Sequence, residues 1–117
     1  MRFLAIAVLS LLPTSAFAVS DCRVTGQPAE FGVDMTAYFA VRPGETCNFP
    51  IRLPGVMHSS GISQKPSHGT LRQLNLTTFR YTAASGYTGN DTFAIYGSGK
   101  GPYGSGRSVM TVNATTQ

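Results

Sequence analysis

The chain has 117 residues, 12% of them charged, and its formal net charge at pH 7 is +4. This length fits one small domain and excludes a second hydrophobic core. The charges are scattered, with no basic run and no arginine cluster. The sequence therefore lacks the electrostatic footprint of nucleic-acid-binding proteins and predicts no nucleic-acid partner.

Residues 1–18 have the three parts of a secretory signal peptide. Arg2 gives the positive start, residues 3–12 form the apolar run, and an Ala-Phe-Ala cleavage site ends at Ala18. Because a membrane-spanning helix needs roughly 20 apolar residues, this run is too short for an anchor. We expect cleavage after Ala18, a single domain over residues 19–117 in the periplasm or outside the cell, and no membrane insertion of that domain.

Two cysteines, Cys22 and Cys47, remain once the leader is removed. Exported proteins meet oxidising conditions in which thiols pair. A disulfide between these two residues is expected to stabilise the domain by roughly 3 kcal/mol in the chain-entropy model. A redox motif would separate its cysteines by two residues, so we interpret this pair as a structural cross-link.

Strand signals dominate the rest of the chain, because glycine and proline recur every few residues and no long window has a helical period. Residues 47–53 alternate apolar and polar side chains. Pro50 cannot donate to a strand partner, which predicts an edge strand or a bulge there. Further strands are predicted over residues 35–41, 56–62, 70–75, 78–83, 91–96 and 107–114, with tight turns at 42–45 and 75–77.

Alternate side chains of these strands predict a shared core. Short strands separated by regular turn signals are typical of a β-sandwich or a small barrel. The predicted core pairs are Phe79 with Tyr81, Phe93 with Ile95, and Met110 with Val112.

Three motifs in the second half of the chain carry a resemblance to a known family. Pro66-Ser67-His68-Gly69-Thr70-Leu71 is followed by Phe79-Arg80-Tyr81-Thr82 and by Gly86-Tyr87-Thr88-Gly89-Asn90-Asp91-Thr92-Phe93. This succession resembles the turn, strand end and corner of the bacterial cadherin-like, Ig-like domains, which occur as tandem repeats in large surface proteins. The resemblance implies an all-β fold, an Ig-like antiparallel β-sandwich, here with one disulfide, and a role as a spacer or adhesive module.

The same motifs have a physical interpretation as architecture. Gly86 and Gly89 suit positive φ in a tight turn, Tyr87 can cover the edge of the core, and Asp91 can accept backbone N–H bonds within the turn. His68 is expected to have a hydrogen-bonding structural role, and no acidic cluster marks a calcium site at Asp91. The predicted structural corner comprises His68, Gly69, Tyr81, Gly86, Tyr87, Gly89, Asp91 and Phe93.

Catalytic and metal-binding patterns are missing from the sequence. His58 lies beside two serines, which does not define a triad. Gly61-Ile62-Ser63-Gln64-Lys65 lacks the final glycine of a nucleophile elbow. No pair of carboxylates stands out for glycoside hydrolysis, and no zinc-finger spacing is present. We therefore predict no enzyme activity, no metal and no cofactor.

Residues 97–106 are rich in glycine. The run lacks the Gly-Lys-Ser/Thr ending of a phosphate-binding loop and is interpreted as a long, mobile hairpin loop. Lys100, Tyr103 and Arg107 form the candidate binding loop. A sugar-binding platform would instead draw on Tyr38, Tyr87, Tyr96 and Tyr103.

Three functional hypotheses follow. The first is a non-enzymatic, exported Ig-like module for binding or structure at the cell envelope. The alternative is a secreted inhibitor of an envelope hydrolase, and a second alternative is a small carbohydrate-binding or hydrolytic accessory protein. The expected partner is an envelope protein or a polysaccharide whose identity the sequence does not reveal.

Overall fold

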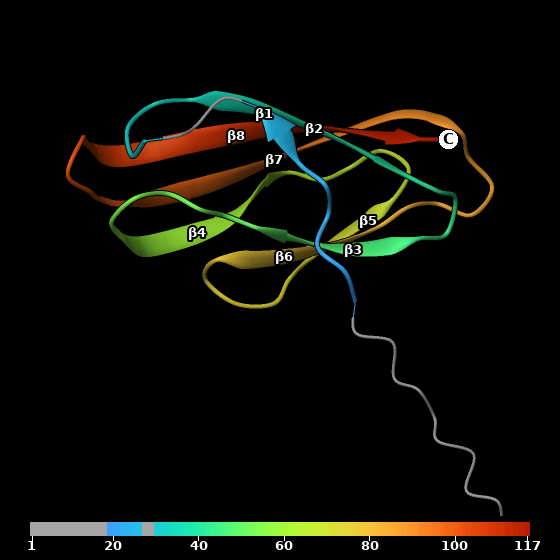
Figure 1. Ribbon diagram of the computed structural model, residues 1–117, viewed down its shortest axis with the longest axis horizontal. Helices are drawn as coiled ribbons and strands as arrows, with labels where there is room; N and C mark the ends of the chain where they lie inside the picture. The colour runs from blue at the N-terminus through green and yellow to red at the C-terminus, as the bar shows by residue number, and fades with distance from the viewer. Residues whose placement is uncertain (1–18, 27–29) are drawn as a thin grey trace, which may run out of the picture.

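The computed structural model describes residues 19–26 and 30–117, and the predicted leader lies outside these residues. None of the described residues forms a helix long and apolar enough to cross a membrane. The fold is all-β (Figure 1). Its strands are β1 (Thr25–Gly26), β2 (Met35–Val41), β3 (Thr46–Pro50), β4 (Val56–Gln64), β5 (Thr70–Gln73), β6 (Thr78–Thr82), β7 (Gly89–Lys100) and β8 (Ser105–Thr116).

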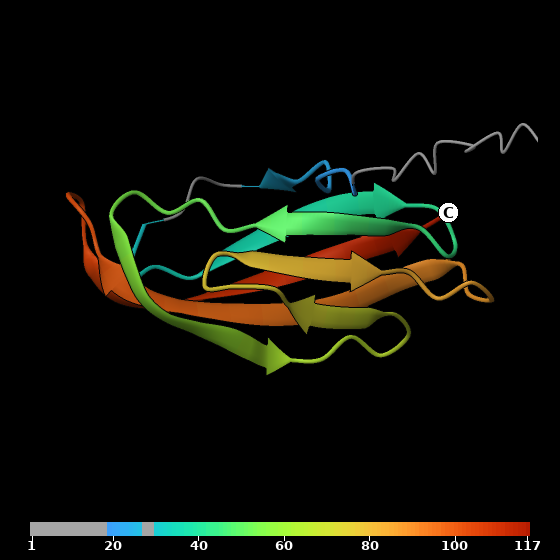
Figure 2. The ribbon, with the colours of Figure 1, turned by 90° about the horizontal axis from the view of Figure 1, so that it is seen from below.

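The strands form two stacked sheets (Figure 2). One sheet has the order β1-β2-β8-β7-β4 and the other has the order β3-β6-β5. The expectation of purely antiparallel pairing is wrong for one pair, because β2 runs parallel to β8. From β2 onward each connection reverses the chain direction. Two strands whose numbers differ by an even number therefore run in the same direction. Once β2 lies beside β8, six strands later, their pairing must be parallel.

Predicted and observed strands agree best in the middle of the chain. Strand β2 covers the predicted residues 35–41. Strand β3 ends at Pro50, whereas the predicted strand continued to residue 53. Strand β3 is an edge strand of its sheet, as the missing N–H of Pro50 predicts. The alternation nevertheless continues beyond the strand, because Ile51 is buried and its N–H donates to the carbonyl of Thr77. The short strand β1 was not predicted.

Side chains from both sheets meet in one core. The six residues that were predicted in pairs are all buried. At the centre, the ring of Tyr81 lies 5.5 Å from that of Phe39 and 5.4 Å from that of Phe93, measured between centroids. Aromatic contacts at these separations add about 0.5–1.5 kcal/mol each to the stabilisation from burial. The core thus joins β2, β6 and β7 across the two sheets.

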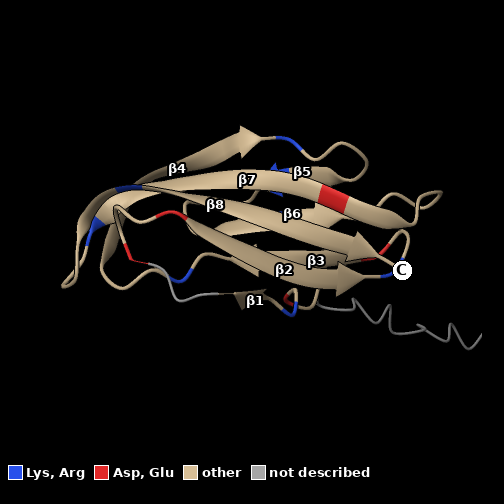
Figure 3. Cartoon of the chain, turned by 90° about the horizontal axis from the view of Figure 1, so that it is seen from above, with Lys and Arg blue, Asp and Glu red and all other residues tan. Residues whose placement is uncertain are grey.

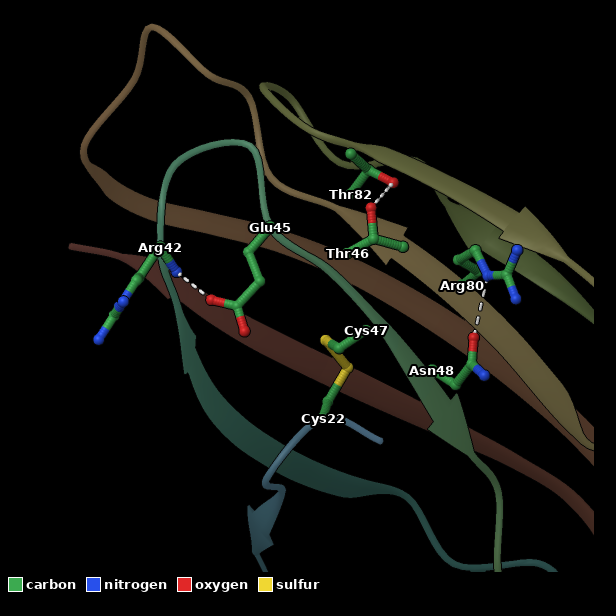
Figure 4. The surroundings of a disulfide bond; sticks show 8 residues. All are labelled: Cys22, Arg42, Glu45, Thr46, Cys47, Asn48, Arg80 and Thr82. Atoms are coloured by element: carbon green, nitrogen blue, oxygen red, sulfur yellow. Dashed lines mark hydrogen bonds between the residues drawn. A yellow bond between two sulfur atoms is a disulfide. The ribbon is translucent and has the colours of Figure 1, made fainter. Parts of the chain in front are cut away.

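The predicted disulfide between Cys22 and Cys47 is confirmed, with a sequence separation of 25 (Figure 4). It fixes the N-terminal segment along the free edge of β3. There the N–H of Asn48 donates to the carbonyl of Ser20 at 2.9 Å, and the N–H of Cys22 donates to the carbonyl of Asn48 at 2.7 Å. The cross-link therefore secures an element that covers an otherwise open strand edge.

Candidate functional site

The β7–β8 hairpin forms one end of the molecule (Figures 1 and 2). The expectation of a long loop over residues 97–106 is wrong. Strand pairing is continuous up to Lys100 opposite Ser105, and the N–H of Gly101 donates to the carbonyl of Gly104 at 2.8 Å. The connection is therefore a short turn on a long two-stranded ribbon.

The glycines of this hairpin make room for neighbouring groups. The side chain of Phe31 is only 2% exposed. A Cβ atom on Gly99 would lie 2.7 Å from the Phe31 ring, and one on Gly104 would lie 2.6 Å from the Phe31 carbonyl oxygen. A Cβ on Gly101 would collide with the carbonyl oxygen of Pro54. The glycine content therefore reflects close packing.

Phe31 is held in place by hydrogen bonds between its own loop and β8. The Ser108 hydroxyl donates to the carbonyl of Glu30 at 2.8 Å and accepts from the N–H of Gly32 at 3.0 Å. The Asp34 carboxylate accepts from the N–H of Val109 at 2.9 Å. Sequence reasoning missed this anchor. The only signal for it was an isolated aromatic residue in an irregular segment.

The anchored hairpin and the neighbouring start of β4 present a group of exposed side chains, which we call the tip surface: Val56, Lys100, Tyr103 and Arg107. Tyr103 lies in the turn and is 73% exposed. The Arg107 guanidinium lies 4.1 Å from the centre of the Tyr96 ring, a cation–π contact that restricts its position. Lys100, at the end of β7, lies opposite Val56, the first residue of β4. Two cations, Lys100 and Arg107, and the exposed Tyr103 therefore belong to the same hairpin.

Asp91 is the centre of the predicted structural corner. It is 1% exposed. Its Oδ1 atom accepts from the N–H groups of Ser67 at 2.9 Å and His68 at 3.1 Å. Its Oδ2 atom accepts from the N–H of Gly69 and the hydroxyl of Tyr81, both at 2.7 Å. The expectation that Asp91 binds its own turn is wrong, because it holds the turn at residues 67–69.

The environment of this corner shifts two pKa values. Burial alone raises the pKa of Asp91, but the four hydrogen bonds outweigh burial and hold this pKa below its usual value. Burial and the hydrogen bond to the Asp91 carboxylate together raise the pKa of Tyr81. Asp91 is therefore a buried, ionised structural acceptor and is not accessible to a substrate.

The remaining corner residues have different roles. His68 has a hydrogen-bonding role through its backbone N–H, which donates to Asp91, and its ring stacks on that of Tyr87 with 3.6 Å between centroids. The Tyr87 hydroxyl donates to the carbonyl of Asn90 at 2.8 Å. Gly89 has a φ of 132°, whereas Gly86 has no positive φ and does not need to be glycine for that reason. Phe93 belongs to the core.

The polar groups considered for catalysis are dispersed. His58 is exposed on β4. The carboxylate of Glu45 accepts from the N–H of Arg42 (Figure 4). Asp21 lies 3.8 Å from Arg52 at the surface. In residues 19–26 and 30–117, no three His, Cys, Asp or Glu side chains are grouped to hold a metal ion.

The four candidate platform tyrosines fall into two classes. Tyr38 and Tyr103 are exposed. Arg107 covers the ring of Tyr96, and His68 covers that of Tyr87. Only the first two rings therefore offer a free aromatic surface to a ligand.

No family model, no curated protein sequence and no solved structure matches this chain. The likeness to the cadherin-like domains therefore rests on the three sequence motifs.

Proposed function

We propose that the domain is an Ig-like sandwich. If β3 to β8 are taken as strands B to G, one sheet has the order B-E-D and the other contains C-F-G, as in Ig-type sandwiches. The Asp91 cluster also joins residues from all three motifs of the resemblance. The placement of β2 beside β8 differs from the constant-type sandwich, in which the first strand joins the other sheet, and the disulfide joins β3 to the N-terminal segment rather than linking the two sheets.

Export is the second part of the proposal. The apolar leader, the Ala-Phe-Ala site and the disulfide all fit a protein that folds outside the cytoplasm. Mass spectrometry of the protein recovered from the envelope or the medium is expected to give a chain that begins at Val19 with no free thiol. Recovery of an uncleaved chain with reduced cysteines would contradict export.

The function that the geometry supports best is non-enzymatic binding of an envelope protein through the tip surface. The observation that carries it is that one hairpin, anchored by Phe31, has the exposed Tyr103 in its turn and the exposed Lys100 and Arg107 on its two strands. Tyrosine and arginine are enriched among residues that dominate binding energy, and an already ordered hairpin loses little entropy on binding. The two cations favour a partner with an acidic contact surface.

Capture from envelope extract tests this function. The oxidised domain is immobilised in parallel with a Tyr103→Ala/Lys100→Ala variant and a Tyr38→Ala control. One protein is expected to bind the intact domain and the control, and to bind the double variant at least about 30-fold more weakly, since a central tyrosine contributes about 2 kcal/mol or more. Equal retention by all three proteins would contradict the tip surface as the contact.

Inhibition of an envelope hydrolase is the second candidate. The hairpin projects from one end of the sandwich, far from the C-terminus, and this shape fits an enzyme cleft (Figures 1 and 2). If the captured protein is a hydrolase, its activity is expected to fall as the domain is added and to reach its minimum at one-to-one stoichiometry. If the hydrolase keeps its full activity in the complex, inhibition is excluded and the domain only binds this protein.

A further inference from the structure

Apart from Asp91, whose side chain is buried, the middle of β2, β7 and β8 has no charged residue (Figure 3). On β2 and β8, residues that face outward alternate with buried core residues, and β7 follows the same alternation except at Ala94, which is buried. The outward side chains around Tyr38 are small, hydroxylic or amide-bearing: Thr36, Ala40, Asn90, Thr92, Val109, Thr111, Asn113 and Thr115. Tyr96 borders this region opposite Val109, and Arg107 covers its ring.

Tyr38 stands between two hollows on this face. It is 52% exposed, and its neighbours on the same face of β2 are the smaller Thr36 and Ala40. A hollow of about 540 Å³ is lined by Tyr38, Thr36 and Thr111 among others. A second hollow, of about 390 Å³, is lined by Tyr38, Ala40 and Thr115 among others. The tyrosine therefore forms a ridge with open space on either side.

The two hollows contain groups that can bind hydroxyls. Thr36 and Thr111 are directly opposite each other on β2 and β8, so the first hollow has a pair of adjacent side-chain hydroxyls. Asp34 also lines this hollow; the N–H of Val109 binds its Oδ1 atom and fixes the carboxylate, whose Oδ2 atom remains an acceptor. Arg23 lines the second hollow and supplies donors.

We propose that this face binds a neutral, linear oligosaccharide across Tyr38. The C–H face of one sugar ring packs on the tyrosine ring, and the flanking sugars lie in the two hollows. Their hydroxyls bond to Thr36, Thr111 and Asp34 in the first hollow and to Arg23 and Thr115 in the second. The chemistry of the face favours this ligand, because the region has hydroxyl and amide groups without a cluster of either charge. Asp34 and Arg23 line separate hollows, and Arg107 borders the region over the Tyr96 ring, so the charges are separated and an anionic polymer finds no basic track here.

This inference adds a ligand class to the proposed binding role but uses a surface separate from the hairpin tip. The two can therefore fail independently. Loss of saccharide binding in Tyr38 variants leaves capture of a protein through Tyr103 unaffected, and the reverse also holds.

Titration calorimetry with defined tetrasaccharides tests the proposal. The probes are the neutral tetramers of β-1,4-linked glucose, β-1,4-linked N-acetylglucosamine and α-1,4-linked glucose, with tetragalacturonate as the anionic comparison. At least one neutral tetramer is expected to bind with a Kd of about 1 mM or tighter. Tyr38→Ala is expected to weaken this binding at least tenfold, whereas Tyr38→Phe keeps the ring and changes the Kd by less than threefold.

Two further variants keep the result interpretable. Thr111→Val removes one hydroxyl from the first hollow while preserving side-chain shape, and it is expected to weaken binding severalfold. Tyr103→Ala is expected to bind the tetramer like the unmodified domain. Absence of binding by all neutral tetramers, tighter binding of tetragalacturonate, or an effect of Tyr103→Ala equal to that of Tyr38→Ala would each overturn the proposal.

Discussion

Replacement of Asp91 with asparagine is expected to lower the free energy of unfolding at neutral pH by about 3 kcal/mol. The carboxylate accepts four hydrogen bonds in a buried position. An amide NH₂ group at Oδ2 would point a donor at the N–H of Gly69, which would lose its partner. Urea unfolding followed by circular dichroism measures the difference.

The effect of this substitution is also expected to depend on pH. The pKa of Asp91 is lower in the folded protein than in the unfolded chain, so its contribution to stability is complete above about pH 4 and is lost as the pH falls through the folded-state pKa. The asparagine variant lacks this contribution at every pH. The stability difference between the two proteins is therefore expected to shrink below about pH 4 and to stay constant between pH 5 and 8.

Two matched variants separate the corner from a general sensitivity of this region. Asn90→Ala changes the exposed neighbour of Asp91 and is expected to cost less than about 0.5 kcal/mol. Tyr81→Phe removes one of the four donors and is expected to cost about 1 kcal/mol. An Asp91→Asn variant as stable as Asn90→Ala, or with a pH-independent deficit down to pH 2, would contradict the role assigned to the carboxylate.

The second large effect is expected at Gly99, where alanine should destabilise the domain by about 2–3 kcal/mol. The added Cβ would lie 2.7 Å from the Phe31 ring and closer still to the carbonyl oxygen of Val56 on the paired strand. Neither neighbour can retreat easily, because Phe31 is buried and Val56 belongs to β4. The same urea unfolding experiment gives the magnitude.

Gly86→Ala is the matched control for this prediction. A Cβ at Gly86 would meet nothing within 4 Å, and its φ is not positive, so the substitution is expected to change stability by less than about 0.5 kcal/mol. If both glycine variants have the same stability, the hairpin is not anchored on Phe31. The tip surface would then not be held in place by Phe31 before it binds a partner.

The two binding surfaces depend on this architecture in different ways. The tip surface needs the packing of hairpin glycines around Phe31, which fixes Tyr103 and Lys100 at the end of the molecule. The face around Tyr38 needs only regular strand alternation, which exposes every second residue of β2 and β8. Gly99→Ala is therefore expected to weaken protein capture more than saccharide binding.

The sequence by itself determined the local features of this protein. All-β structure, the predicted core pairs and the turns at 42–45 and 75–77 follow from a two-residue period and from turn chemistry, which act over a few residues. The disulfide was predicted from the cysteine count together with the expected export of the protein. The edge position of β3 followed from the missing N–H of Pro50.

Only the tertiary structure decided which distant groups meet. The sequence indicated a polar role for Asp91 but not that its partners lie in the turn at 67–69, because that contact depends on how β7 passes the start of β5. The sequence shows that residues 97–106 are rich in glycine, but it does not show that Phe31 packs against them, because the two segments are far apart in the chain. Tyr38 and Phe39 likewise have similar local patterns, and only the placement of β2 beside β8 decides which ring joins the core and which faces solvent.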